Sequence, residues 1–320
     1  MKRCAAATAI TLVIAACSQD SPNAPNASPP PSSAQASHIH IMPLMGHALP
    51  GSAPAPSPTV DNGIYYHGGP VIRAQQVAAI YWSSKTIYAG GPAPGTTGPG
   101  SADGSLIGYF LNHLGGSPYY NINTTYTDGA GTAIQNSVTY TQFWASNTNV
   151  PLPVVPVTDL QMQNQIIAGF TSGQLTYDPS TLYLIFSDQL VNLGGGFGSV
   201  YCAYHGNFSW NGNDVKYAAM PHDSDFFDCN ALSGSPNNDA AADAEVNTLA
   251  HETEETNTDE DLNAWYDNSG NENGDKCAWN FGTTYKTANG STANMKIGTK
   301  DFLVQQNWVN ANGGGCRLSW

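Results

Sequence analysis

Apolar residues recur at helical spacing in two stretches of the chain, 106–114 and 159–170. Gly115-Gly116 follows the first stretch, and glycine commonly follows the last turn of a helix, so a helix is predicted over 106–114. The second stretch has the same period and predicts another helix. The apolar positions are Leu106, Ile107, Phe110, Leu111 and Leu114 in the first stretch and Leu160, Ile166, Ile167 and Phe170 in the second.

Runs of β-forming residues before, between and after these helices predict strands. Residues 71–82 have their β-formers at both ends and predict one or two strands, and residues 138–140 predict another. The continuous apolar run 182–186 is typical of a central strand that is buried on both faces. Residues 302–305 are expected to form the last strand. Because strands and helices interleave, the predicted fold class is α/β or α+β with a mixed sheet.

A third helix is predicted over residues 239–257, because Asn237-Asn238-Asp239 offers an N-cap with an acid in the first turn and alanines follow. It carries His251-Glu252-Thr253-Glu254-Glu255, which places His251 and Glu255 on one helix face, one turn apart. These two side chains are expected to hold a metal ion, with Glu252 beside it as a base. The pattern is that of the HExxH helix of zinc hydrolases with the second histidine replaced by glutamate, and it predicts a single zincin-like domain.

Acidic residues are concentrated around this motif. Residues 217–275 hold 15 of the chain's 24 acidic residues and none of its 10 Lys and Arg. Six of these acids fall within 252–261, near the expected helix C-terminus, where the helix dipole and neighbouring like charges disfavour them. A divalent cation would offset both costs, and a solvated acidic face is the alternative. The net charge of −14 argues against nucleic acid as a partner.

The chain begins with the features of an export signal. Met1-Lys2-Arg3 precedes an apolar run that ends in Ile14-Ala15-Ala16-Cys17, which resembles a bacterial lipobox. Residues 1–16 are therefore predicted to be a lipoprotein signal peptide. Cys17 would carry the lipid anchor to a bacterial membrane, at the outer membrane or the cell surface. The alternative is an ordinary cleaved signal and a secreted protein.

Residues 17–62 are predicted to be a disordered tether, because they are rich in Pro, Ser and Ala and carry little apolar surface to bury. The histidines in this segment are expected to be solvated rather than to bind metal; they are His38, His40 and His47.

Residues 63–320 suit one domain. Its four cysteines predict two disulfides in an oxidising compartment. Of three pairings, the most local is favoured, and it joins Cys202 to Cys229 and Cys277 to Cys316.

Several motifs, in matching order, resemble the phosphate-induced protein 1 family, also called EXORDIUM-like. They are Ala250-His251-Glu252 with Glu255, Asn263-Ala264-Trp265-Tyr266, then Glu272, Asp275 and Cys277, with further likeness at 182–187, 201–205 and 302–316. The resemblance covers about residues 70–316 and, with the lipobox and tether, suggests a bacterial member. It implies an exported protein linked to cell surfaces and growth, without an established reaction. Plant members carry Asn-Pro where this chain has Asp259-Glu260.

A catalytic zinc site needs three protein ligands and an open position, so a third ligand must join His251 and Glu255. The candidates are His205, Asp259, Glu272 and Asp275, and the resemblance favours Glu272 and Asp275, with Asp275 slightly ahead and His205 as the rival. Zinc is the expected ion. Calcium is the alternative, because residues 267–275 place oxygen-bearing side chains at every second position.

The predicted function is a surface-anchored zinc hydrolase, a peptidase or amidase acting on a peptide or cell-wall substrate. Glu252 would be its general base. The alternative of another class is a non-catalytic binding or signalling protein in which the same residues hold a structural ion. A metal site that is open to solvent on one side favours the enzyme, and a sealed site favours the binding protein.

Overall fold

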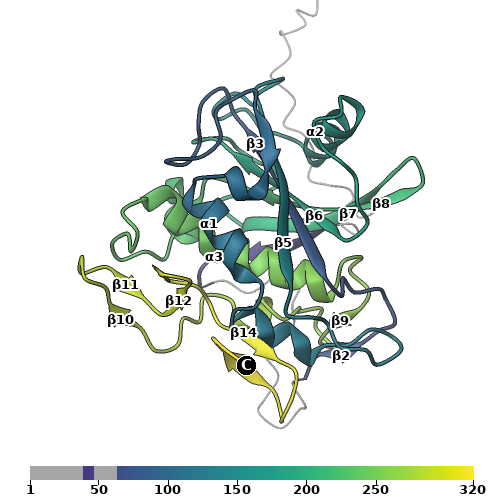
Figure 1. Cartoon of the computed structure of the whole chain (residues 1–320). Coiled ribbons are helices and arrows are strands. Elements are labelled where there is room, and N and C mark those ends of the chain that lie inside the picture. Colours follow the sequence, from purple (N-terminus) through teal and green to yellow (C-terminus); the bar gives the residue numbers. More distant parts are fainter. Residues whose placement is uncertain (1–38, 47–62) are drawn as a thin grey trace, which may run out of the picture.

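Seven strands form one mixed sheet in the part of the chain that the computed structural model describes, residues 39–46 and 63–320 (Figure 1). In sheet order they are β1 (Ile39–Pro43), β7 (Tyr201–Trp210), β8 (Asn213–Met220), β6 (Thr181–Ser187), β3 (Gln75–Trp82), β5 (Val138–Ser146) and β4 (Thr97–Pro99). The four strands from β8 to β5 are parallel to one another. The outer pairings are antiparallel. The predicted α/β architecture with a mixed sheet is confirmed.

Helices cover both faces of this sheet. α1 (Leu106–Leu114) and α3 (Ala240–Thr258) lie on one face, and α2 (Asp159–Thr171) lies on the other (Figure 1). Alternate residues of β3 point to opposite faces, as strand geometry requires. Val77, Ala79 and Tyr81 therefore join the core under α1 and α3, and Ala78, Ile80 and Trp82 join the core under α2.

The helices predicted from apolar spacing form close to the expected bounds. α1 spans the predicted residues, and its N-cap Ser105 accepts a hydrogen bond from the Gly108 amide. α2 begins after Thr158, which forms a capping box with Gln161. The run predicted as a central strand is β6, which lies between β8 and β3 and is buried along its whole length.

The strand expected at 302–305 is only partly formed. β13 (Lys300–Phe302) ends where that strand was expected to begin. Beyond it, the Asn294 side chain accepts from the Val304 amide at 3.0 Å and donates to the Val304 carbonyl at 2.6 Å. The Gln305 amide donates to Asn247 Oδ1 at 2.7 Å. Side chains therefore satisfy this backbone in place of a partner strand, which the local sequence did not indicate.

α3 is enclosed on every side, although it carries many acidic residues. Asp239 caps its N-terminus by accepting a hydrogen bond from Ala242. Every residue from 242 to 258 is buried. The helix contacts α1, the strands β7, β8 and β1, and the short helix η3 (Tyr120–Thr125). Carboxylates that are buried this way need charged or hydrogen-bonding partners.

Small two-stranded ladders and short 3-10 helices complete the domain. The ladders pair β2 (Tyr65–Tyr66) with β9 (Trp265–Tyr266), β10 (Tyr285–Lys286) with β11 (Thr292–Ala293), β12 (Met295–Ile297) with β13, and β14 (Asn307–Val309) with β15 (Gly315–Arg317). The other short helices are η2 (Gly100–Ala102), η4 (Asp223–Asp225), η5 (Phe227–Cys229) and η6 (Asp275–Cys277).

The two disulfides have the local pairing favoured from the sequence. Cys202–Cys229 joins β7 to η5, and Cys277–Cys316 joins η6 to β15. Both pairs have Cα separations within the usual range for disulfides, at 5.4 and 5.6 Å. The second bond restrains η6, which begins at Asp275.

The expected tether contains a strand, which corrects the prediction of disorder for residues 39–46. β1 pairs with the edge of β7, and Met42 and Leu44 are buried beside it. Trp279 donates from its indole nitrogen to the Pro43 carbonyl at 2.8 Å, and the Met45 amide donates to the Asp228 carbonyl at 2.9 Å. Composition alone failed here because the strand depends on partners that are distant in the sequence.

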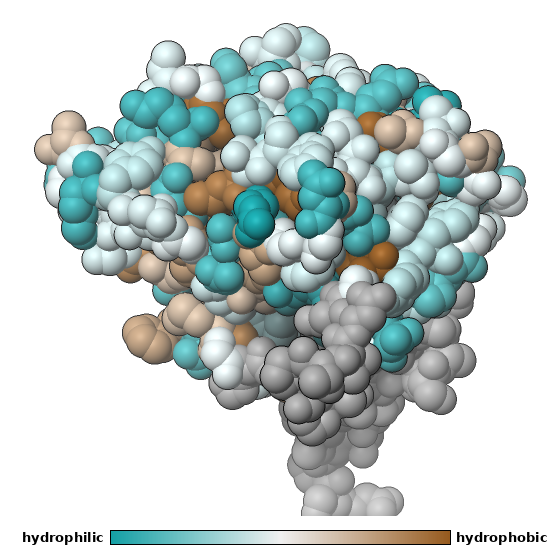
Figure 2. Space-filling model, turned by 90° about the horizontal axis from the view of Figure 1, so that it is seen from below, coloured by the Kyte–Doolittle hydropathy of each residue, from teal (hydrophilic) through white to brown (hydrophobic). Residues whose placement is uncertain are grey.

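The predicted signal peptide, the Cys17 anchor and the rest of the tether lie outside the described residues. Within the described ranges, no helix combines the length and apolarity that a membrane crossing needs. Where described residues are drawn, the face in Figure 2 is mostly hydrophilic, with small apolar areas set among polar residues.

Candidate metal centre

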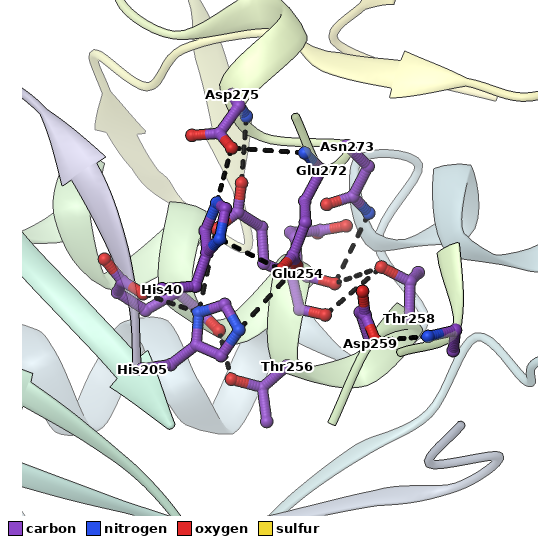
Figure 3. Close-up of polar contacts among 12 residues, drawn as sticks. His40, His205, Glu254, Thr256, Thr258, Asp259, Glu272, Asn273 and Asp275 are labelled. Carbon is purple, nitrogen blue, oxygen red and sulfur yellow. Dashed lines mark hydrogen bonds and ion pairs between the residues drawn. The ribbon is translucent and has the colours of Figure 1, made fainter. Parts of the chain in front are cut away.

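A cluster of histidines and carboxylates lies where the second half of α3 meets the edge of the sheet (Figure 3). Three members come from α3, two from the paired strands β1 and β7, and two from the loop before η6 and the first residue of η6. They are His251, Glu252 and Glu255, then His40 and His205, then Glu272 and Asp275.

The strand register explains why two histidines face the helix together. His40 of β1 lies directly opposite His205 of β7, so both rings project from the same face of the sheet. Their ring centroids are 5.6 Å apart. The neighbours of His40 point the other way, and Ile39 and Ile41 pack on the core under α2.

Four groups meet on the His40 side of the cluster. His251 Nε2 lies 3.0 Å from Glu255 Oε2 and 3.6 Å from Asp275 Oδ1. His40 Nε2 lies 2.6 Å from Asp275 Oδ2. His40, Glu255 and Asp275 each offer a ligand atom, and these atoms lie within 4.8 Å of one another. This arrangement suits a shared cation.

A second group forms on the His205 side. His205 Nε2 lies 3.7 Å from Glu272 Oε2, and His205 Nδ1 lies 3.7 Å from Glu255 Oε2. His205, Glu255 and Glu272 also offer ligand atoms within 4.8 Å of one another. Figure 3 shows the rings of His40 and His205 turned toward the carboxylates of the loop. Glu255 belongs to both groups.

Six buried polar atoms of this cluster lack a hydrogen-bond partner among the described residues. His251 Nε2 and Glu255 Oε2 are 3.0 Å apart but lack hydrogen-bond geometry. An unpaired buried polar atom costs about 1–3 kcal/mol. A cation bound between these atoms would satisfy them. They are His205 Nε2, His251 Nε2, Glu252 Oε1, Glu255 Oε2, Glu272 Oε2 and Asp275 Oδ1.

Burial works against ionised carboxylates in this cluster. It raises the pKa of Glu252, with the charge of Glu255 adding to the shift. It also raises the pKa of Glu255 and of Glu272, each beside other carboxylates. Burial lowers the pKa of His40, but the charge and hydrogen bond of Asp275, together with the charges of Glu255 and Glu252, raise it to about 9. A divalent cation would let these carboxylates stay ionised, because it supplies the opposing charge.

Hydrogen bonds outside the ligand atoms hold these side chains in place. Glu252 Oε2 lies 3.0 Å from His205 Nδ1, which fixes that ring and leaves Nε2 facing the loop. The Asp275 amide donates to Glu255 Oε1 at 2.9 Å. Gln305 Nε2 lies 3.0 Å from His251 Nδ1 and donates to the Gly274 carbonyl at 2.8 Å. Such outer partners orient metal ligands in known sites.

The tautomer of His251 has a consequence for ion binding. Because Gln305 points its amide nitrogen at Nδ1, the proton of a neutral His251 ring lies on Nε2. An ion bound at Nε2 would move that proton to Nδ1. Gln305 would then have to turn its amide over, which would break its hydrogen bonds with the Gly274 carbonyl and the Trp279 amide.

Most of the residues predicted from the sequence come together here. His251, Glu252 and Glu255 lie with His205, Glu272 and Asp275. Asp259 has a different main contact, because its Oδ1 accepts from the amides of Asn263 and Ala264, both at 2.6 Å, just after the end of α3. Burial raises its pKa to about 6.

His40 was missed as a site residue, because its Pro-rich surroundings indicated a solvated linker. The only local signal was the alternation of Ile39, His40 and Ile41, which is typical of a strand with one apolar face. The pairing with β7 that brings His40 to the cluster depends on residues far along the chain.

The first carboxylate of the loop considered for calcium is satisfied by contacts with nearby residues of the chain. Asp267 Oδ1 accepts from the amides of Ser269 and Asn271, at 2.8 and 3.0 Å. Asp267 Oδ2 lies 3.2 Å from Lys276 Nζ. The first carboxylate of the loop is therefore turned away from the cluster, and this does not favour the calcium-loop hypothesis.

The cluster is closed to solvent except on one side. The side chains of His205, Glu252 and Glu255 have no exposed surface, and those of Glu272 and Asp275 have 2% and 1%. The His40 side chain is 18% exposed. Any small molecule that reaches the cluster from outside must therefore pass His40 or displace β1.

Comparison with known protein families, curated proteins and solved structures gives no match for this chain. The zincin-like and EXORDIUM-like relationships therefore stay predictions from the motifs.

Proposed function

We propose that this chain is a metalloprotein whose buried centre holds a divalent ion between α3, the β1–β7 pair and the loop before η6. The observation that carries the proposal is the set of unpaired ligand atoms that face one another inside the protein. Hydrogen bonding within the described residues leaves these atoms unsatisfied. A metal ion coordinated by these atoms would satisfy them, and it brings no polar group that would itself need a partner.

The ligand types favour a first-row transition ion, with Zn²⁺ first. Three imidazoles and several carboxylates face the centre, and imidazole suits zinc and its neighbours in the periodic table. Calcium prefers six to eight oxygen ligands, which is a poorer fit to a site that contains His40, His205 and His251.

Hydrolysis at this centre is the second candidate function. The specific observation in its favour is Glu252, whose Oε1 is unpaired among the described residues and lies beside the ligands. A bound ion would lower the pKa of a water molecule towards neutrality and polarise a carbonyl group. Glu252 would take a proton on Oε1 while Oε2 keeps its bond with His205. The substrate, a peptide or cell-wall amide, would enter past His40.

Ion binding stands ahead of hydrolysis for two physical reasons. Glu252 Oε2 already lies 3.0 Å from His205 Nδ1 and orients that ring. Only the other oxygen of this carboxylate is therefore free to act as a general base. The ligands have almost no exposed surface, so turnover requires that His40 or β1 move aside.

The setting of the protein is part of the same proposal. We infer an exported chain, either secreted or anchored through Cys17 to a bacterial membrane, with a distant relationship to the EXORDIUM-like family. The sequence motifs support this inference, and the two disulfides suit an oxidising compartment.

Two matched variants test both functions. Glu255→Gln removes a ligand charge and is expected to lower the zinc content of purified protein at least tenfold. Glu252→Gln keeps an oxygen that can accept from His205, so it should retain the ion. Under the hydrolase hypothesis, Glu252→Gln also abolishes cleavage of a peptide library. Equal zinc in Glu255→Gln and the unchanged protein contradicts the metalloprotein proposal, and full cleavage by Glu252→Gln contradicts hydrolysis.

A further inference from the structure

We propose that the centre holds two divalent ions, with Glu255 as the carboxylate that bridges them. This inference rests on the proposed function and specifies its site. One ion would lie with His40 and Asp275, and the other with His205 and Glu272. His251 faces the first of these positions.

The two ligand groups adjoin each other and share one residue, and His40 Nδ1 of the first lies 3.5 Å from Glu272 Oε1 of the second. Each contains one histidine and two carboxylates, and Glu255 is the member common to both. At bond lengths of about 2.0–2.2 Å, two ligands of one zinc ion lie at most about 4.4 Å apart. Because each group already lies within 4.8 Å, each needs only a small contraction around an ion.

Glu255 has the contacts expected of a bridge. Its Oε2 is unpaired among the described residues and lies 3.0 Å from His251 Nε2 on one side. On the other side, Glu255 offers a ligand atom within 4.8 Å of ligand atoms of His205 and Glu272. Its Oε1 is fixed by the Asp275 amide at 2.9 Å, so the carboxylate is held between the two groups.

One ion would leave part of the cluster unsatisfied. A structural zinc ion takes four ligands. An ion bound beside Asp275 and His251 leaves His205 Nε2 and Glu272 Oε2 buried, 3.7 Å apart and without a hydrogen-bond partner among the described residues. An ion on the His205 side leaves His251 Nε2 and Asp275 Oδ1 in that state. Two ions satisfy both sets.

The charge of the cluster also fits two ions. Glu252, Glu255, Glu272 and Asp275 together carry a formal charge of −4 when ionised, and their side chains are almost fully buried. With neutral histidines, one divalent ion leaves −2 on these four groups and two leave zero, and the buried carboxylate of Asp259 adds a further negative charge nearby. An uncompensated buried charge is strongly unfavourable, so the second ion accounts for a charge that the first leaves.

The sharing of one carboxylate suggests how the pair would act. Two-metal sites have ions about 3.5–4 Å apart and clamp the attacking and leaving oxygens of a displacement. They serve the hydrolysis of phosphate esters as well as peptides. A bridged pair here would therefore widen the candidate substrates of the hydrolase hypothesis to phosphate esters at the cell surface.

The test is the stoichiometry of metal binding by the full chain. Protein stripped with a chelator is loaded with Zn²⁺, desalted and measured by elemental analysis. The expected result is two ions per chain. His205→Ala should bind one, whereas His113→Ala, a control at an exposed histidine of α1, should bind two.

Loading with Mn²⁺ gives a second measurement that needs no variant. Two ions bridged by Glu255 should give an exchange-coupled spectrum in electron paramagnetic resonance at two equivalents. One ion per chain, or two uncoupled ions, overturns the bridged pair and leaves the proposed metalloprotein intact. A second ion that persists in folded His205→Ala also overturns it. No bound ion at all contradicts both proposals.

Discussion

Gly274 offers a way to disturb the metal centre without changing a ligand. It precedes Asp275 and has ordinary right-handed backbone angles, φ −72° and ψ −41°. A Cβ at this position would lie 2.9 Å from both Glu255 Oε1 and His251 Nδ1, where ordinary contact begins at 3.4 Å. Gly274→Ala must therefore push both of these side chains away by about 0.5 Å, because overpacked atoms move apart.

The backbone around Gly274 cannot easily relieve this contact. Its carbonyl accepts from Gln305 at 2.8 Å, and the next amide donates to Glu255 at 2.9 Å. Changes to the partners that orient metal ligands typically lower affinity 10–100-fold. We therefore expect Gly274→Ala to weaken zinc binding by about 1.4–2.8 kcal/mol, since each tenfold is about 1.4 kcal/mol.

The assay is competition for Zn²⁺ against a chromophoric chelator, followed for the unchanged protein and two variants. Gly270→Ala is the control in the same loop. Its Cβ meets nothing within 4 Å, but its φ of +83° makes alanine strained by about 1–2 kcal/mol. It should lose stability and keep its zinc affinity. Zinc affinity within twofold of the unchanged protein in Gly274→Ala would refute the placement of the ion beside His251 and Glu255.

Two further predictions concern stability. Removal of the ion by a chelator should lower Tm by about 8–16 °C: an ion at 1,000 times its Kd contributes about 4.1 kcal/mol, and each kcal/mol shifts Tm by about 2–4 °C in a domain of this size. An unchanged Tm in calorimetry would argue against a tightly bound ion. Burial raises the pKa of Glu245 to about 8, so its carboxyl is protonated in the folded state and ionised in the unfolded state between about pH 4.5 and 8. Its stabilising contribution is therefore complete below about pH 4.5 and is lost as pH rises to 8. Glu245→Gln, which still accepts from the Asp223 amide, should flatten this fall in urea unfolding; an equally steep fall in the variant would contradict the assignment.

The elements that local patterns define were predicted well. α1 ends where Gly115 follows the apolar stripe, and α3 begins at the Asp239 cap, because spacing and capping act within a few residues. β6 was recognised as central because both of its faces are buried in apolar layers. β1 was not, because its order comes from pairing with β7, more than a hundred residues further along the chain.

The site was predictable only in part for the same reason. His251 and Glu255 share a helix face, so their spacing alone brings them together. His205, Glu272 and Asp275 were found through a resemblance rather than through spacing. Their distances from α3 depend on the whole sheet and on a disulfide-held loop. The sequence assigned Glu252 the role of a general base. The structure adds the role of orienting His205, through a contact that exists only in the folded chain.

The central claim is that divalent metal lies among these buried side chains. A crystal structure with diffraction data collected on both sides of the zinc absorption edge tests it most directly. We expect anomalous peaks beside Glu255, one towards His40 and Asp275 and one towards His205 and Glu272. A map without such peaks, from zinc-loaded crystals in which these carboxyl groups hydrogen-bond to one another as protonated acids, would contradict it.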